Sequence, residues 1–268
     1  MNAQIPRYIV LSLALVFAAQ SAAARQPQQN SGASPALSPR DMQEERAKLF
    51  MAEKRYEDAI DAYHELLKSE PKNALLLNMV GIAYLDLSNF EQAQKYFQRS
   101  IKADKKYVSA VSNLGMVWYH QKDFRRAIRQ YKKAIAIDPR QAGTHANLGF
   151  AYYNSNKFPE AAAEFQKAAD LDPHIFEHSD RVGVMVQDRT VANHGQFFYM
   201  MARVYAQKGD PAHCAAYLRK SMDEGYKDIK NVKTDPAFKD ILDDPGVQAV
   251  LVLIFPAEQK ADAAEPGA

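Results

Sequence analysis

Three histidines close together in the sequence have the spacing that most resembles a metal or hydrolytic site. His174 and His178 stand four positions apart and His194 follows, with acidic residues among them. A His-x-x-x-His spacing puts two imidazoles on one face of a helix, where both can ligate zinc. A zinc-protease helix also needs an acid directly after its first histidine, whereas Ile175 stands there. The pattern therefore favours a polar loop, and a metal-binding or hydrolytic role for this segment is the alternative.

The only cysteine, Cys214, would need a nearby base and an exposed, low-pKa environment to act as a nucleophile. Neither a G-x-S-x-G nucleophile elbow nor a phosphate-binding P-loop occurs in the chain, which has only 11 glycines. A single cysteine cannot form an internal disulfide, so stability has to come from packing. We therefore expect no catalytic residue, no metal site and no cofactor, and the sequence favours a protein that is not an enzyme.

The chain as a whole is nearly neutral. It has 268 residues, of which 47% are apolar, enough for a substantial core, and its net charge is +2. The densest basic cluster, Arg125 to Lys133, is interrupted by apolar residues at helical spacing, so we interpret it as a solvated helix face. Without a uniform basic surface, nucleic acid is not an expected partner.

The first 24 residues have the pattern of a secretion signal. Arg7 precedes an apolar run from Tyr8 to Ala19, and small residues follow up to Ala24, where we expect cleavage. The run is shorter than the roughly 20 residues of a membrane-spanning helix. We therefore predict an exported protein, periplasmic or secreted, with no stable membrane span after cleavage. The alternative is an uncleaved N-terminal segment that holds it at the membrane. Residues 25–39, rich in Gln, Ser, Pro and Ala, are expected to be a disordered linker.

A period of 34 residues runs through the centre of the chain. Its clearest marker is a small residue, and aromatic residues and prolines recur with it, which predicts paired helices that pack closely. Aromatics three positions after a glycine or alanine share its helical face, so they are expected in the core. The markers are Ala59, Ala93, Ala127 and Ala161; Tyr63, Phe97, Tyr131 and Phe165; Ala47, Gly81, Gly115 and Gly149; Phe50, Tyr84, Trp118 and Tyr152; and Pro71, Pro139 and Pro173.

With this period and the pairs Val80-Gly81, Leu114-Gly115 and Leu148-Gly149, the chain closely resembles the tetratricopeptide repeat family. The resemblance implies an all-α fold, a right-handed α-α superhelical solenoid of helix pairs. In the last repeat Cys214 takes the place of the periodic alanine, so it is expected to be a small buried packing residue. The first repeat is more polar, as suits the end of a stack. Repeats are expected at residues 40–73, 74–107, 108–141, 142–173 and 195–226.

The repeat register breaks at residues 174–194, where about 19 residues are inserted before the last repeat. Two β-prone stretches within this insertion, 181–186 and 189–191, predict a short extended or β-hairpin-like arm. Farther on, Asp235-Pro236 and Asp244-Pro245 each place a capping acid before a first-turn proline. They predict two helices within residues 227–256 that cap the last repeat, Pro236 to Leu242 and Pro245 to Phe255. Residues 257–268 are expected to be a disordered tail.

The family resemblance implies a binding surface on the concave face of the solenoid, formed by the first helix of each pair. Apolar and aromatic side chains left exposed there indicate a partner. The alternative is that the superhelix curls tightly enough to bury several of them against the insertion or the C-terminal helices. We therefore predict a non-enzymatic interaction scaffold or adaptor of the cell envelope whose partner is a protein or peptide. The predicted groove residues are Asn78, Ile82, Leu85, Ser112, Met116, Tyr119, Phe150, Tyr153, Tyr199 and Arg203.

Overall fold

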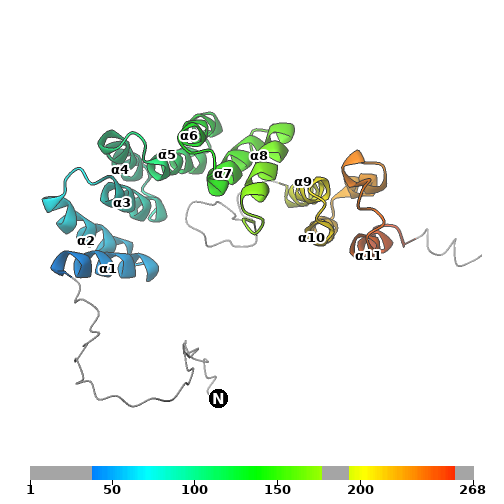
Figure 1. Cartoon of the computed structure of the whole chain (residues 1–268), viewed down its shortest axis with the longest axis horizontal. Helices are drawn as coiled ribbons and strands as arrows, with labels where there is room; N and C mark the ends of the chain where they lie inside the picture. The colour runs from blue at the N-terminus through cyan, green and yellow to red at the C-terminus, as the bar shows by residue number, and fades with distance from the viewer. Residues whose placement is uncertain (1–37, 177–192, 257–268) are drawn as a thin grey trace, which may run out of the picture. The chain divides into compact units, whose positions relative to one another are not determined.

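The computed structural model describes residues 38–176 and 193–256, and within these ranges the chain forms helices and no strand. The helices follow one another as pairs joined by short turns (Figure 1), which confirms the expected all-α solenoid. No helix in these ranges has the length and apolarity needed to cross a membrane. The elements are α1 (Pro39–Ala52), α2 (Tyr56–Ser69), α3 (Ala74–Asp86), α4 (Phe90–Ala103), α5 (Val108–His120), α6 (Phe124–Ile137), α7 (Ala142–Tyr153), α8 (Phe158–Leu171), α9 (His194–Gln207), α10 (Pro211–Asp223), η2 (Lys227–Lys233), η3 (Pro236–Phe238) and α11 (Pro245–Ile254).

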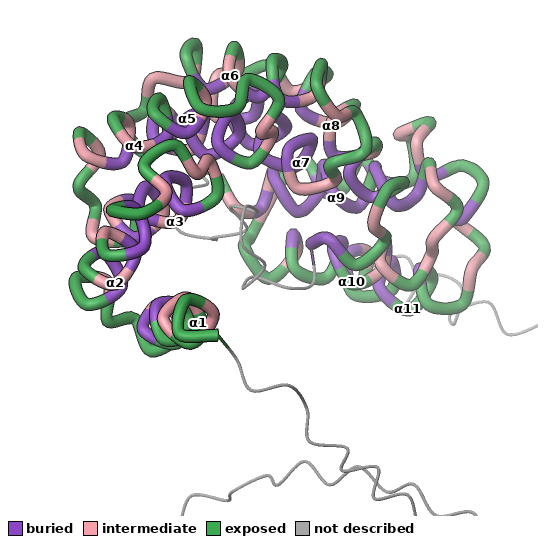
Figure 2. The backbone as a smooth tube through the Cα atoms, turned by 60° about the vertical axis from the view of Figure 1, so that its left-hand side comes forward, coloured by how far each residue is buried: buried purple, intermediate pink, exposed green. Residues whose placement is uncertain are grey.

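Each repeat consists of two helices that pack against each other, and its second helix packs against the first helix of the next repeat. The pairs are α1–α2, α3–α4, α5–α6, α7–α8 and α9–α10. The first helices also touch one another directly, α3 with α5 and α5 with α7. This arrangement buries the first helices from several sides, whereas the second helices keep a polar face in solvent. In Figure 2, α7 and α9 are accordingly buried along most of their length.

Close contact within the three middle pairs depends on glycine. A Cβ atom added at Gly81, Gly115 or Gly149 would lie 2.6 Å from a ring carbon of an aromatic residue on the second helix of the same pair. These rings have no exposed surface, so they have no free space into which they can move. The periodic glycine and the periodic aromatic are therefore the two sides of one helix-helix contact, which is why both recur every 34 residues.

The turn inside each repeat contains one residue in the left-handed backbone region. The φ angle is 59° at Lys54, 58° at Ser88, 61° at Lys122 and 58° at Asn156. The equivalent residue of the fifth repeat is Gly209, with a φ angle of 72°. Only glycine adopts this conformation without steric cost, so four of the five turns carry a small backbone strain that the packed helices must maintain.

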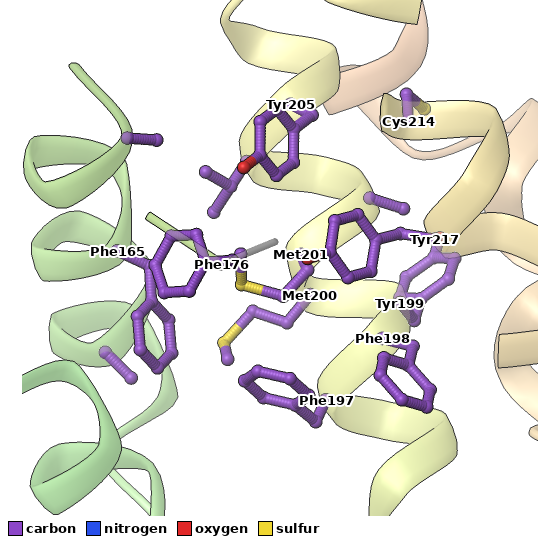
Figure 3. Packing of buried hydrophobic residues seen from close by; sticks show 14 of the residues in the cluster. Phe165, Phe176, Phe197, Phe198, Tyr199, Met200, Met201, Tyr205, Cys214 and Tyr217 are labelled. Atoms are coloured by element: carbon purple, nitrogen blue, oxygen red, sulfur yellow. The ribbon is translucent and has the colours of Figure 1, made fainter. Parts of the chain in front are cut away.

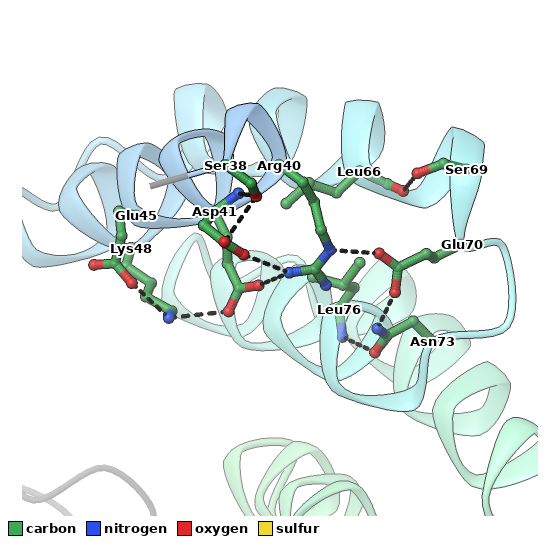
Figure 4. A network of polar contacts seen from close by, with 11 residues as sticks. Ser38, Arg40, Asp41, Glu45, Lys48, Leu66, Ser69, Glu70, Asn73 and Leu76 are labelled. Atoms are coloured by element: carbon green, nitrogen blue, oxygen red, sulfur yellow. Dashed lines mark hydrogen bonds and ion pairs between the residues drawn. The ribbon is translucent and has the colours of Figure 1, made fainter. Parts of the chain in front are cut away.

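A network of charged and polar side chains closes the N-terminal repeat (Figure 4). Arg40 Nε donates to Glu70 Oε1 at 2.7 Å, and Arg40 Nη1 donates to Glu44 Oε2 at 2.6 Å. Glu70 also accepts a hydrogen bond from Asn73, whose own side-chain oxygen caps α3 by accepting from the backbone N–H of Leu76. The network ties α1 to the turn between α2 and α3 with polar groups at the first described repeat.

The first helix begins slightly earlier than predicted. The Ser38 hydroxyl accepts a hydrogen bond from the backbone N–H of Asp41 at 3.1 Å and so acts as an N-cap, with Pro39 in the first turn. Ser38 and Pro39, which were predicted to lie in the disordered linker, are therefore the N-cap and the first residue of α1. Residues 25–37 of that predicted linker, the predicted signal segment and the predicted C-terminal tail lie outside the described residues.

The C-terminal elements differ from the prediction in two respects. The predicted helix from Pro236 to Leu242 is wrong, because only the short 3-10 turn η3 forms there, and the 3-10 helix η2 before it was not predicted. The second predicted helix forms as α11, and the Asp244 carboxylate caps it by accepting from the backbone N–H groups of Gly246 and Val247. The 3-10 turn η3 packs against α9 and the helix α11 packs against α10, so both cover the last repeat.

An extensive apolar cluster joins the fourth and fifth repeats (Figure 3). The Phe165 ring of α8 contacts Phe176 and Phe197 edge-on, with ring centroids 5.5 and 5.7 Å apart. Ile175 and Phe176 are buried, so the beginning of the segment predicted as an insertion belongs to the core. The predicted hairpin-like arm within it lies outside the described residues.

Candidate functional site

Most of the side chains predicted to line an exposed groove are buried. Seven of the ten have less than a tenth of their surface exposed, Ile82 and Met116 are half-buried, and Arg203 is exposed. The expectation of an open aromatic groove is therefore wrong for most of its length. Neighbouring repeat helices cover most of these residues, and only Tyr199 lies against a C-terminal element, beside Phe238, as the alternative expected. Their role in binding stays a prediction. The buried seven are Asn78, Leu85, Ser112, Tyr119, Phe150, Tyr153 and Tyr199.

The polar residues of the predicted groove join successive first helices. Asn113 Nδ2 donates to Asn78 Oδ1 at 3.0 Å, which connects α5 to α3. Thr144 Oγ1 donates to Ser112 Oγ at 3.3 Å, which connects α7 to α5. Both bonds are buried, and a ligand that took over either group would leave the other partner unsatisfied, at a cost of about 1–3 kcal/mol. Asn78 and Ser112 therefore hold the repeats together.

The aromatic residues of the predicted groove are covered by neighbouring helices. Phe150 lies against Phe165 of α8 and Phe197 of α9, with ring centroids 5.0 and 5.5 Å apart. The Tyr153 hydroxyl donates to the backbone oxygen of Asn193 at 2.9 Å. Because the fifth repeat packs its first helix over the end of α7, side chains that would face solvent in an isolated repeat are enclosed here.

Three of the predicted residues nevertheless meet at one pocket, because Tyr153, Tyr199 and Arg203 all line a recess of about 680 Å³. The recess lies between α8 and α9, and the break in the repeat register falls between the same two helices. α8 and α9 share a smaller interface than the other pairs of consecutive repeats, which leaves the recess open. The other lining residues are Phe158, Pro159, Ala162, Ala163, Gln166, Lys167, Gln196, Met200, Val204, Gln207 and Tyr226.

The polar groups of this pocket are suited to recognition. Tyr199 donates to Asp235 Oδ2 at 3.1 Å, and Arg203 Nε forms an ion pair with the same oxygen at 2.9 Å. Burial and the charge of Asp235 raise the pKa of Tyr199, and burial raises the pKa of Tyr153 to about 12. Both phenols therefore stay protonated at neutral pH and act as hydrogen-bond donors or acceptors, not as general bases.

A second recess, of about 460 Å³, includes three other predicted residues, Asn78, Ile82 and Ser112. It runs along the first turns of α5 and α7 and reaches Asp172 and Ile175 beyond the end of α8. The two recesses have no lining residue in common, so the structure divides the predicted continuous groove into two sites. Four predicted residues, Leu85, Met116, Tyr119 and Phe150, line neither of them.

The histidines and the cysteine noted in the sequence do not form a reactive cluster in the described parts of the chain. Residues 38–176 and 193–256 contain no group of three or more His, Cys, Asp or Glu side chains placed to hold a metal. His194 Nδ1 lies 4.0 Å from Glu224 Oε2, and His178 is outside the described residues. Cys214 has no exposed surface, and burial raises the pKa of its thiol to about 12, so it is the packing residue that its place in the repeat predicts.

A different histidine, His145, has a hydrogen-bonding environment that favours its charged, doubly protonated ring. Its Nδ1 lies 2.6 Å from Glu164 Oε2, and its Nε2 lies 2.9 Å from the backbone oxygen of Pro139. Both partners are acceptors, so both ring nitrogens must carry a proton for both bonds to form, which makes the ring an imidazolium. The hydrogen bond to Glu164 accordingly raises the pKa of His145. The bond to Pro139 links the end of the third repeat to the fourth, and the bond to Glu164 joins α7 and α8 within the fourth repeat.

Sequence reasoning missed the contribution of α8 to the larger pocket. Pro159, Ala162, Ala163 and Gln166 form one of its walls, whereas the prediction considered only the first helix of each pair. The break in the 34-residue register could have revealed them. A second helix that is followed by a displaced repeat keeps part of its inner face uncovered.

Paired helices at a fixed period, with recesses between them, define a repeat scaffold, a class of protein built to present surfaces to other molecules. Tetratricopeptide repeat models match residues 44–87, 78–142, 119–175 and 195–223. The chain belongs to the tetratricopeptide repeat family, whose repeats support a protein-protein interaction scaffold. None of the curated proteins compared with it matches.

Several solved structures are similar to the chain. MamA 41-end from Desulfovibrio magneticus RS-1 is 19% identical, with a TM-score of 0.49, and the match covers 71% of this chain and 97% of that one. TTC0263, a thermophilic TPR protein in Thermus thermophilus, is 17% identical with a TM-score of 0.49, over 75% of this chain and 99% of that one. YrrB, a TPR protein with an unusual peptide-binding site, is 18% identical with a TM-score of 0.44, over 70% and 88%. At these identities the similarity concerns the fold alone.

Proposed function

We propose that this repeat protein is an exported, non-enzymatic interaction scaffold of the cell envelope that holds a peptide segment of its partner in the pocket between α8 and α9. The observation that carries the proposal is the convergence of Tyr153, Tyr199 and Arg203 on one recess of about 680 Å³. α8 supplies the opposite wall of that recess. A recess with two walls can enclose a ligand side chain, which an open helix face cannot do.

The lining of the pocket favours an uncharged segment with one large apolar side chain. Pro159, Met200 and Val204 offer apolar surface, and its burial contributes about 25 cal/mol per Å². Arg203 is already paired with Asp235, so its charge is neutralised before any partner arrives. The side-chain amides of Gln196 and Gln207 can donate to and accept from the backbone of an extended peptide, which gives the contact direction and register. The Tyr153 and Tyr199 hydroxyls already donate to Asn193 and Asp235, so towards a peptide they can only accept.

The experiment compares two alanines, one inside the pocket and one outside. Ala163 is exposed on α8 and lines the pocket, so Ala163→Trp obstructs the recess without entering the core. Ala52 is exposed at the end of α1 and provides the matched control, Ala52→Trp. A phage-displayed library of random peptides is panned against the wild-type mature chain, and the affinities of selected peptides are then measured by fluorescence anisotropy.

Peptides selected on the wild type should lose at least about tenfold in affinity for Ala163→Trp and keep their affinity for Ala52→Trp. Circular dichroism verifies that both variants are folded. Peptides that bind Ala163→Trp as tightly as the wild type, or a library that yields no binding peptide, would contradict the proposed site.

The cell-envelope location is supported by the signal-like pattern of residues 1–24. Fractionation of the source cells followed by N-terminal sequencing tests it. We expect the protein in the periplasm or the medium, with Arg25 as its first residue. An uncleaved chain in the membrane fraction would support the anchored alternative, and an uncleaved chain in the cytoplasm would refute export.

A further inference from the structure

Positive charge is concentrated in the second and third repeats. Residues 90–140 carry 12 Lys and Arg against four Asp and Glu, whereas the rest of the chain carries 22 and 28. All 12 basic side chains are exposed, and they lie on α4, on α6 and in the turns beside these helices. The chain is nearly neutral only because acidic residues elsewhere balance a net charge of +8 in this region.

Most of this charge has no ion-pair partner within the described part of the protein. Among the 12 side chains only Arg126 forms an ion pair with a described residue, with Asp123 at 3.0 Å. Asp104 and Asp138 of the same region each accept a hydrogen bond from the backbone N–H group two residues later, at 2.8 and 3.0 Å. Arg99 and Lys132 lie over the rings of Tyr96 and Tyr152, at 4.8 and 5.7 Å. The positive charge of the region is therefore largely left without a neutralising carboxylate among the described residues.

A recess of about 490 Å³ lies within this basic region, between α4 and α6, with α5 beneath it. Val111 and Leu114 of α5 are buried and form an apolar floor, while Lys105, which follows α4, and Lys133 of α6 are exposed. We call this recess the basic groove. Its lining residues are Gln98, Ile101, Lys105, Val111, Leu114, Gln130, Lys133, Ala136 and Ile137.

We propose that the basic groove binds an acidic protein segment that carries one large apolar side chain. The apolar floor takes this side chain, and carboxylates on either side of it meet Lys105 and Lys133. The basic groove has no lining residue in common with the pocket between α8 and α9, so it is a second and independent site. A purely solvated helix face, as expected for Arg125 to Lys133 from the sequence, does not account for an apolar recess beside the charges.

Two other anionic partners fit the basic groove less well. An anionic bilayer receives apolar groups that project beyond the charged ones, whereas here Val111 and Leu114 are buried while Lys105 and Lys133 are exposed, and Ile137 is the one large apolar side chain of the lining that is exposed. Duplex nucleic acid would use the charges through its phosphates but would leave the apolar floor empty. Only an acidic protein segment uses both features of the recess.

The experiment measures the binding of fluorescein-labelled peptides of about twelve residues to the full mature chain by anisotropy at low salt. The probe is a Glu- and Asp-rich peptide with a central Leu, and its controls replace that Leu by Ala or the acids by Lys. Anionic phosphatidylglycerol vesicles and a labelled DNA duplex test the other two partners. Raising the salt concentration should weaken the binding, because exposed charges are screened beyond about 10 Å at 0.1 M.

Three variants separate the elements of the proposal. The double variant Lys105→Glu, Lys133→Glu should weaken the acidic Leu peptide at least tenfold, while Lys72→Glu, Lys230→Glu, with the same net charge, should leave it unchanged. Ala136 is exposed and lines the groove, so Ala136→Trp should weaken the Leu peptide more than its Ala version. Circular dichroism verifies the fold of each variant.

Equal affinity for the Leu and Ala peptides, or equal loss in the two charge-reversed variants, would overturn the proposal. Tighter binding to the vesicles or to DNA than to the acidic peptide would also overturn it. Ala163→Trp, which obstructs the pocket between α8 and α9, should leave the acidic peptide unaffected. The failure of one site can therefore be distinguished from the failure of the other.

Discussion

The substitution Gly115→Ala tests whether the contact between glycine and an aromatic ring holds the helix pairs together. A Cβ atom at this position would lie 2.6 Å from Tyr131 Cε1 and 2.8 Å from Cδ1, far inside the 3.5–4.0 Å at which carbon atoms attract each other. Tyr131 has no exposed surface, so its ring cannot move aside into solvent. Either α5 and α6 must separate or the ring must leave its preferred conformation.

Two opposing effects determine the size of the loss. Overpacking of a filled core costs about 1–3 kcal/mol. Replacing glycine by alanine in the middle of a helix contributes about 0.5–1 kcal/mol of stability. We therefore expect Gly115→Ala to lower the free energy of unfolding by about 1–2 kcal/mol, measured by urea denaturation followed by circular dichroism.

The fifth repeat supplies the second half of the test. There the equivalent pair is Ala202 and Leu218, both without exposed surface. In a Tyr131→Leu background the clash is absent, so Gly115→Ala should no longer lower stability and should raise it by about 0.5–1 kcal/mol, the gain from helix propensity alone. Gly209→Ala is the matched control, because its cost arises from a φ angle of 72° with no atom within 4 Å, and it should be the same in both backgrounds. A cost of Gly115→Ala that persists after Tyr131→Leu would refute this explanation of the period.

Three further predictions concern single buried groups. The Tyr131 hydroxyl is buried and has no hydrogen-bond partner among the described residues, so Tyr131→Phe should leave stability unchanged or raise it by up to about 1 kcal/mol in urea denaturation; a loss above 1 kcal/mol would show that the hydroxyl is satisfied. Folding raises the pKa of His145, so its pair with Glu164 stabilises the fold fully below about pH 6.5 and loses that effect as the pH rises through the folded pKa. Wild type should lose stability from pH 6 to 9 relative to His145→Gln, and parallel pH profiles would contradict the imidazolium assignment. The Cys214 thiol, buried and with a pKa of about 12, should react with a thiol reagent only after denaturation, and rapid labelling of the native protein would show that it is accessible.

The repeat architecture could be predicted from the sequence because each repeat places the same residue types in the same contact. Gly115 and Tyr131 are recognisable as a pair since they recur in register with Gly81 and Phe97. The turns were less visible: Lys54 and its equivalents adopt a left-handed conformation without the glycine that usually signals it. Only the fifth repeat carries that glycine.

The candidate site could be predicted only in part, because exposure depends on how consecutive repeats pack. Phe150 stands at a groove position in the sequence, yet Phe165 and Phe197 enclose it, and no local pattern shows this. Tyr199 and Arg203 line one recess, but their place in the repeat did not indicate their neighbours on α8, and their role in binding stays a prediction. Likewise, the nearly neutral net charge of the whole chain gave no sign of the basic groove. Its residues come together only when α4 and α6 pack on α5.

Site-specific photo-cross-linking tests the central claim, that the pocket between α8 and α9 holds the partner. A photoreactive phenylalanine derivative is introduced in the source cells at Ala163, inside the pocket, or at Ala52, outside it. After irradiation, the account predicts one defined cross-linked species from position 163 and none from position 52, with the cross-linked partner peptide identified by mass spectrometry. Cross-linking from position 52 alone, or the same products from both positions, would contradict it.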